Sequence, residues 1–295
     1  MAKVGAAIGS GIMRLIICLL LLTGSGELAV ASVQVVDDLG LRVELESSPE
    51  RIVSLSPHLT ELLFSLGVGE KIVATVEHSD YPPAAQEIPR LGDAFSLSVE
   101  AIIDLSPDLI LAWSTGGNQR TLAHLRELGY VIYLSEARSL EAIGRAAAQL
   151  GALVGKAETG LQLEADYLKQ LSVIRTSAKS EPEPSIFFQI SDEQLYTVNG
   201  DHLIGQAITA CGGRNIFGEL DLVVPMVSLE SVLDANPDLI LVASPYEGFV
   251  TRWSDAWDGL GWQGRVRYID ASLVTRPGLR MLEGIKSMCK SMKDV

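Results

Sequence analysis

The chain has 295 residues, of which 47% are hydrophobic and 20% are charged. This length is enough for two domains that each bury a core, and the composition excludes a disordered chain. The formal net charge of −14 argues against nucleic acid or an anionic membrane surface as a partner, because both repel an acidic protein.

The N-terminus has the three regions of a secretory signal peptide. Lys3 and Arg14 precede the apolar run 15–22, and residues 29–31 (Ala-Val-Ala) have the form of a cleavage site. The run is far shorter than the roughly 18 residues that a membrane span needs. We therefore expect cleavage after residue 31, a net charge of −15 and a soluble periplasmic monomer. An uncleaved N-terminal anchor is the alternative.

Residues 32–150 alternate between strand and helix patterns with short connections. The loosely alternating residues 33–46 predict a hairpin. Buried strands are expected at 51–55, 72–76, 109–113 and 131–134, helices at 60–66, 98–105 and 121–128, and a long loop at 77–96. This alternation predicts an N-terminal α/β lobe with a parallel sheet.

The middle of the chain is rich in helix formers. Residues 139–177 contain no proline, although Gly151, Gly155 and Gly160 weaken the first half. Residues 157–178 predict one helix about 33 Å long, which the two prolines of 181–184 end. We expect the segment 151–180 to connect two lobes stiffly, so that the lobes move little on ligand binding.

A second α/β lobe is predicted over residues 181–295. Its expected strands are at 185–189, 239–242 and 267–269, and its helices are at 203–210, 228–233 and 278–290. Residues 97–112 and 227–242 repeat one another at an offset of 130 and are identical at eight of sixteen positions. Two copies indicate two similar lobes, and a cleft between lobes is a common place for a small molecule.

Two cysteines, Cys211 and Cys289, remain after removal of residues 1–31. A single pair in an oxidising compartment favours a disulfide bond. The bond would join the start of the second lobe to the C-terminal helix. Two buried free thiols are the alternative.

Short signatures run along nearly all of the mature chain. They are 56–61 (SPHLTE), 79–83 (SDYPP), 97–100 (LSVE), 107–113 (PDLILAW), 211–217 (CGGRNIF) and 227–230 (VSLE). With them the chain resembles the substrate-binding proteins of ABC importers that serve metal-chelate nutrients, and especially the vitamin B12-binding members. The resemblance implies two Rossmann-like lobes with parallel sheets joined by one long α-helix.

The resemblance also implies a function. Such a protein captures a corrinoid like cobalamin outside the inner membrane and delivers it to an ABC permease dimer with its ATPase. It uses no cofactor and catalyses no reaction. Glu100 and Glu230 match the glutamates that dock onto arginines of the two permease subunits in this family. A carboxylate near a helix start is also favoured by the helix dipole, which is the purely structural reading.

Positions that match the family's corrin site are the candidate ligand contacts. The candidates are Ser56, Pro57, His78, Tyr81, Phe95, Trp113, Tyr196 and Arg276. Trp113 and Arg276 are retained, whereas Ala94 and Val224 stand where the B12 binders have tryptophan. Losing two indoles should weaken corrinoid binding or mark a different ligand. Core packing of Trp113 and a surface role for Arg276 are the alternatives.

No residue is expected to bind metal directly, although His78, with Tyr81 or His58, could coordinate cobalt or haem iron. A hydrogen-bonding role for His78 is the simpler reading. His124 and His202 have no metal-ligand spacing.

Competing functions follow from the same residues. Haem or a ferric siderophore is the alternative cargo, but an anionic siderophore suits a basic cleft, and this cleft offers mainly Arg276 and Arg280. An enzyme using His78, Ser79 and Asp80 lacks a partner for these loop residues. The common nucleophile, phosphate-loop, zinc and dinucleotide motifs do not occur in the required contexts. A stand-alone sensor domain is the last alternative.

Overall fold

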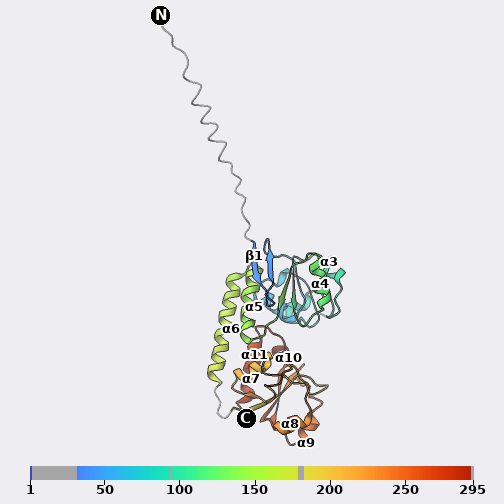
Figure 1. The fold of residues 1–295 in the computed structure, drawn as a ribbon, viewed down its shortest axis with the longest axis vertical. Coiled ribbons are helices and arrows are strands. Elements are labelled where there is room, and N and C mark those ends of the chain that lie inside the picture. Colours follow the sequence, from blue (N-terminus) through green and yellow to red (C-terminus); the bar gives the residue numbers. More distant parts are fainter. Residues whose placement is uncertain (2–31, 94, 179–182, 294–295) are drawn as a thin grey trace.

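The computed structural model describes Met1 and residues 32–93, 95–178 and 183–293. These residues form two α/β lobes, one above the other, with a pair of long helices along one side (Figure 1). Residues 2–31 of the predicted signal peptide and Ala94 lie outside the described residues. None of the helices in the described ranges has the length and apolar character of a membrane span.

The N-terminal lobe contains a four-stranded parallel sheet in the order β4-β3-β5-β6. The strands are β3 (Ile52–Ser54), β4 (Ile72–Thr75), β5 (Leu109–Trp113) and β6 (Ile132–Ser135). The helices are α2 (Pro57–Ser65), α3 (Val99–Asp104) and α4 (Gln119–Glu127), with 3₁₀ turns at Gly69–Lys71 and Pro83–Glu87. The predicted hairpin is confirmed as β1 (Val33–Val36) and β2 (Arg42–Leu45), which pair antiparallel.

The C-terminal lobe repeats this topology. Its parallel sheet has the order β8-β7-β9-β10, so each strand occupies the place of its counterpart in the first lobe. The strands are β7 (Ser185–Gln189), β8 (Arg214–Asn215), β9 (Leu239–Ser244) and β10 (Val266–Asp270). The helices are α7 (Leu203–Ala210), α8 (Leu229–Ala235), α9 (Ser254–Gly259), α10 (Ala271–Val274) and α11 (Met281–Met292), with a 3₁₀ turn at Gln263–Arg265. The predicted fold class is confirmed.

The connection between the lobes is a hairpin of two helices. The predicted long helix is α6 (Ala157–Ser177), and α5 (Leu140–Leu153) lies against it (Figure 1). Gly155 has a positive φ of +75° in the turn between them, a conformation that suits glycine. A Cβ on Gly160 would lie 2.6 Å from the Ala147 carbonyl oxygen, and one on Gly151 would lie 2.7 Å from the Gly160 Cα. These glycines therefore allow the two helices to touch.

The helical hairpin belongs to both cores. Leu150 and Leu153 of α5 pack in the core of the N-terminal lobe. Leu140, at the other end of α5, packs with Tyr167 and Leu171 of α6 in the core of the C-terminal lobe. The hairpin thus contributes buried side chains to the separate cores of both lobes. The division at 32–150, 151–180 and 181–295 stays a prediction.

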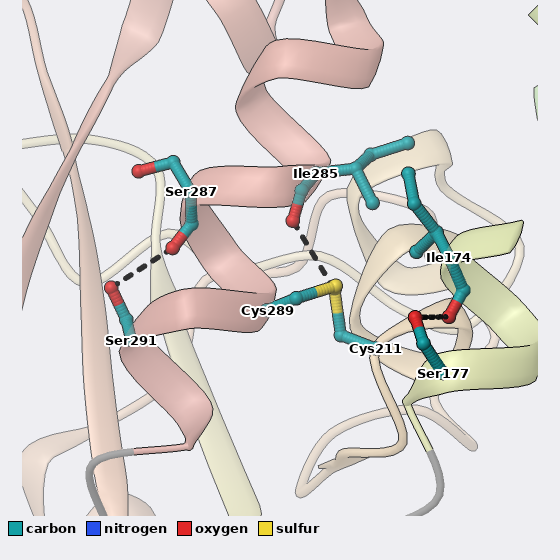
Figure 2. The surroundings of a disulfide bond; sticks show 7 residues. All are labelled: Ile174, Ser177, Cys211, Ile285, Ser287, Cys289 and Ser291. Carbon is teal, nitrogen blue, oxygen red and sulfur yellow. Dashed lines mark hydrogen bonds between the residues drawn. A yellow bond between two sulfur atoms is a disulfide. The ribbon is translucent and has the colours of Figure 1, made fainter. Parts of the chain in front are cut away.

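Cys211 and Cys289 form the predicted disulfide bond, with their Cα atoms 4.8 Å apart. Cys211 follows the last residue of α7, and Cys289 lies within α11. Figure 2 shows the bond between these two helices, with the Cys211 sulfur 3.3 Å from the carbonyl oxygen of Ile285. The bond ties the C-terminal helix to the first helix of the same lobe.

Candidate functional site

A cavity of about 750 Å³ lies between the two lobes. The N-terminal lobe contributes residues 113, 115 and 136–138, and the C-terminal lobe contributes residues 201–203, 206, 223–224, 274–275 and 277. Several of these residues follow the carboxyl ends of parallel strands, which is where α/β folds usually bind ligands. The volume lies within the range of small-molecule sites.

Trp113, the last residue of β5, is the aromatic side chain of the cavity wall. Its indole folds over the loop that follows, where a Cβ on Gly116 would lie 1.8 Å from a ring atom. The ring also meets the imidazole of His58 edge-on, with the centroids 6.0 Å apart. Backbone and neighbours therefore hold the indole in place, with part of its surface on the cavity.

Ser56, Pro57 and His58 lie behind Trp113, at the start of α2. Pro57 is the first residue of the helix, where its missing N–H costs no hydrogen bond. The buried Ser56 hydroxyl and the His58 Nδ1 atom are 2.6 Å apart. Burial, with a smaller contribution from the charge of Arg276, lowers the pKa of His58 to about 3. This imidazole is therefore neutral, and it supports the tryptophan from within the lobe.

Arg276 connects the two lobes. Its Nη1 atom donates to the Glu61 carboxylate at 2.9 Å and to the Asp80 carboxylate at 2.8 Å, both in the N-terminal lobe. Burial works against the charge of Arg276, but the hydrogen bonds to Asp80 and Glu61 outweigh it and raise the pKa of Arg276. The neighbouring residues Thr275 and Pro277 line the cavity. Arg276 itself is not among the lining residues, and its ion pairs hold the guanidinium at the junction of the two lobes.

Arg280 and Tyr81 extend this ionic contact. The Arg280 Nη1 atom donates to Glu61 at 3.3 Å, and its guanidinium lies 3.7 Å above the Tyr81 ring, in a cation–π contact. Burial raises the pKa of Glu61, and the two arginines oppose that shift. Tyr81 therefore contacts a side chain of the other lobe and is not among the residues that line the cavity.

The C-terminal lobe gives the cavity an apolar wall. Val223 and Val224 line it and are 48% and 44% exposed. The segment that carries them pairs with the segment of Tyr196, which forms a bridge with Met226. Tyr196 is 36% exposed and lies beside this wall. The wall is a surface that a large apolar ligand would cover.

His78 and Phe95 are exposed residues outside the cavity lining. His78 has a positive φ of 65°. Within the described ranges no three His, Cys, Asp or Glu side chains gather into a possible metal site.

Sequence reasoning missed the polar residues of the cavity. Gln206 accepts a hydrogen bond from the Leu140 N–H at 3.2 Å and donates to the Arg138 and Asp201 carbonyl oxygens at 2.9 and 2.8 Å. It ties the start of α5 to the C-terminal lobe. Glu136 accepts from the N–H of Thr115 at 3.1 Å and from its hydroxyl. Residues 136–138 come directly after a strand, and this position was the signal that could have identified Glu136.

Glu100 and Glu230 lie at matching positions in the first turns of α3 and α8. These two helices lie toward opposite ends of the two-lobed body (Figure 1). Each helix is capped by the preceding serine, whose hydroxyl accepts from a backbone N–H at 3.2 Å. The backbone N–H of each glutamate and the hydroxyl of that serine lower the pKa of both carboxyl groups. Both carboxylates are exposed and charged at neutral pH.

Comparisons with known proteins agree with this architecture. The family described as periplasmic binding protein matches residues 52–264. The vitamin B12-binding protein of Vibrio cholerae serotype O1 is 34% identical over 247 residues, which are 83% of this chain and 89% of that protein. The crystal structure of the periplasmic vitamin B12-binding protein BtuF of Vibrio cholerae matches with a TM-score of 0.75 at 33% identity, over 83% of this chain and 97% of that one.

A second solved structure is similar at lower identity. It is the periplasmic haem-binding protein RhuT from Roseiflexus sp. RS-1, with a TM-score of 0.72 at 26% identity, over 84% of this chain and 99% of that one. The same fold thus carries two different metal chelates in these relatives.

Proposed function

Because the chain belongs to the periplasmic binding protein family, we propose that it captures a corrinoid of the vitamin B12 type and delivers it to an ABC importer. The observation that carries this proposal is the cavity between two equivalent lobes, with an indole on one side and an apolar wall on the other. A flat macrocycle is held mainly by such apolar and aromatic contacts. No reaction is catalysed in this function.

Trp113 is the proposed stacking residue, and Val223 and Val224 form the opposite apolar contact. Arg276 is a proposed polar contact at the cavity edge: its neighbours Thr275 and Pro277 line the cavity, and the hydrogen bonds to Glu61 and Asp80 use only its Nη1 atom. The remaining candidates, Ser56, Pro57, His78, Tyr81, Phe95 and Tyr196, stay predictions. Of these, Tyr196 has the best support, because it borders the apolar wall.

The charge of the cavity favours a corrinoid over an anionic chelate. Glu136 and Asp201 line it, against one basic lining residue, Arg138. Haem carries two propionates, and ferric siderophores are commonly anionic, so both would meet like charge in this site. Haem is the second candidate because of the relative that binds it.

One experiment separates the two cargoes. Purified protein is mixed with cyanocobalamin or with haemin and desalted, and the absorption spectrum of the protein fraction is recorded. We expect the corrin bands to remain with the protein at about equimolar ratio. Retention of haemin alone would show that the cargo is haem and not a corrinoid. Retention of neither compound would overturn the proposed function.

A substitution of Trp113 tests the site itself. Trp113→Ala should raise the dissociation constant for cyanocobalamin by about ten-fold or more, since aromatic anchors usually contribute a few kcal/mol. Tyr246→Ala is a suitable control, because Tyr246 is 66% exposed and outside the cavity lining. An unchanged dissociation constant would remove the indole from the site.

Delivery requires export to the periplasm and a partner in the membrane. We propose that residues 1–31 are removed on export and that the mature periplasmic monomer meets a permease of two subunits with its ATPase. Glu100 and Glu230 are the proposed docking residues, since two equivalent charges match two equivalent subunits.

A further inference from the structure

His202 lines the cavity and also begins a helix. It is the N-cap residue of α7, and its Nδ1 atom accepts a hydrogen bond from the backbone N–H of Ile204 at 3.1 Å. A side chain that caps a helix satisfies a backbone N–H that would otherwise lack a partner. The imidazole is therefore held in one orientation by its own helix.

This contact fixes the tautomer of the ring. A backbone N–H can only donate, so the Nδ1 atom must keep its lone pair. Burial lowers the pKa of His202 to about 4, so the ring is neutral near pH 7. A neutral imidazole with an unprotonated Nδ1 carries its single proton on Nε2. His202 is therefore a hydrogen-bond donor at Nε2.

The donor is free to meet a ligand. Within the described part of the chain, no hydrogen bond involves the Nε2 atom of His202, and this atom is not among the fully buried ones without a partner. One helical turn further on, the amide of Gln206 is already engaged by three backbone groups. The two polar side chains thus divide their tasks: Gln206 holds the lobes, and His202 faces the cavity.

We propose that His202 donates a hydrogen bond from Nε2 to a carbonyl oxygen on the rim of the bound chelate. For a corrinoid, which this inference takes from the proposed function, that oxygen belongs to one of the peripheral carboxamides. The fixed proton excludes His202 as a metal ligand through Nε2, because coordination needs the lone pair of that nitrogen. His202 then determines specificity by orienting the macrocycle over Trp113.

His202→Asn separates the two tasks of the side chain. Asparagine caps a helix as well as any residue, but its amide ends closer to the backbone and does not reach the ligand. His124→Asn makes the same substitution on α4, outside the cavity. The dissociation constant for cyanocobalamin and the melting temperature are measured for both variants and the wild type.

We expect His202→Asn to weaken cyanocobalamin binding about ten-fold, as for the loss of one hydrogen bond that leaves a polar group unpaired. Its melting temperature should match that of the wild type, and His124→Asn should leave both quantities unchanged. The visible spectrum of bound diaquacobinamide should show no nitrogen ligation that depends on His202.

The outcomes distinguish the inference from the function on which it rests. If the wild type retains cyanocobalamin and His202→Asn binds it as tightly, the inference is wrong and the proposed function stands. A nitrogen-ligated spectrum that disappears in His202→Asn would also overturn the donor role. If the wild type retains no corrinoid, both proposals are wrong.

Discussion

Asp108 and Asp238, which are 130 positions apart, make equivalent contacts in the two lobes. The Asp108 Oδ2 atom accepts from the backbone N–H groups of Glu50 and Arg51 at 2.8 and 2.9 Å. The Asp238 Oδ2 atom accepts from the backbone N–H and the hydroxyl of Ser185 at 2.7 and 2.6 Å. Each aspartate fixes the start of the first strand of its sheet, which explains why the Pro-Asp pair occurs in both halves.

Removal of this contact should destabilise the lobe that it anchors. The Ser185 hydroxyl, with the Ser185 backbone N–H, lowers the pKa of Asp238. Asp238→Ala should lower the free energy of unfolding by about 1 kcal/mol, because the site is partly exposed to water. Urea unfolding measures this change. Asp234→Ala is the control. Asp234 is exposed in α8, four residues before Asp238, and its removal should leave the unfolding free energy unchanged.

The contact between Gly151 and Gly160 makes the helical hairpin sensitive to added volume. Gly160→Val should separate α5 from α6, because even a Cβ would lie 3.0 Å or less from atoms of α5. We expect a loss of roughly 2 kcal/mol or more in stability, as for other overpacked contacts. Gly259→Ala is the control, since a Cβ there meets nothing within 4 Å. Equal urea midpoints for the two variants would show that the helices tolerate separation.

The disulfide bond should contribute strongly to the stability of the C-terminal lobe. It closes a loop with a sequence separation of 78 residues. In the chain-entropy model such a loop corresponds to about 4 kcal/mol. The double variant Cys211→Ala, Cys289→Ala should therefore melt well below the oxidised wild type. Reduction of the wild type should lower its melting temperature similarly and leave the double variant unaffected.

Acid should destabilise the protein through His58, which is buried, and His202, which is partly buried. Burial, aided by Arg276, lowers the pKa of His58 to about 3, and burial lowers the pKa of His202 to about 4. In the unfolded chain both titrate near 6.5, so below that pH the unfolded state binds more protons. Stability is present above about pH 6.5 and falls toward pH 3, by at most about 1.4 kcal/mol per pH unit for each group.

His58→Asn removes one of these groups and should flatten the decline in unfolding free energy between pH 7 and pH 5. His124→Asn, on the exposed surface, should keep the wild-type slope. A His58→Asn slope as steep as that of the wild type would assign the acid sensitivity to other groups.

Glu100 and Glu230 should matter for transport and not for capture. The double variant Glu100→Ala, Glu230→Ala should bind cyanocobalamin with the wild-type dissociation constant, because both carboxylates lie on exposed helix starts outside the cavity lining. Uptake of labelled cyanocobalamin by cells should be abolished. A large loss of affinity would place these glutamates in the ligand site.

The sequence predicted the elements with strong periodic patterns. Apart from β8, the strands of the two parallel sheets follow from apolar runs, as do α6 and, with its turn residues, the hairpin β1–β2. Strand β8 was missed because two residues, Arg214 and Asn215, carry no hydrophobic pattern. Helix α5 and its packing against α6 were missed because Gly151 and Gly160 were interpreted as weak helix positions. Both glycines are needed for the contact between α5 and α6, and the sequence pattern of one helix does not reveal a contact with another.

The site was harder to predict than the fold. Trp113, which lines the cavity, was a candidate because its position matches the corrin site of the family that the chain resembles. Glu136 and His202 were not, because they come from segments 66 residues apart that only the packing of the lobes brings to one cavity. His202 was considered solely for metal spacing, and histidine is not among the residue types that usually cap a helix.

The α5–α6 hairpin has a mechanical consequence. Two helices packed along their length are much harder to bend than a single helix. Gly151 and Gly160 allow this close packing. Separating the lobes would bend both helices together. It would also break the hydrogen bonds that Gln206 and Arg276 make to the N-terminal lobe and to α5. Wide opening of the cavity would therefore cost these hydrogen bonds as well as the bending of two packed helices.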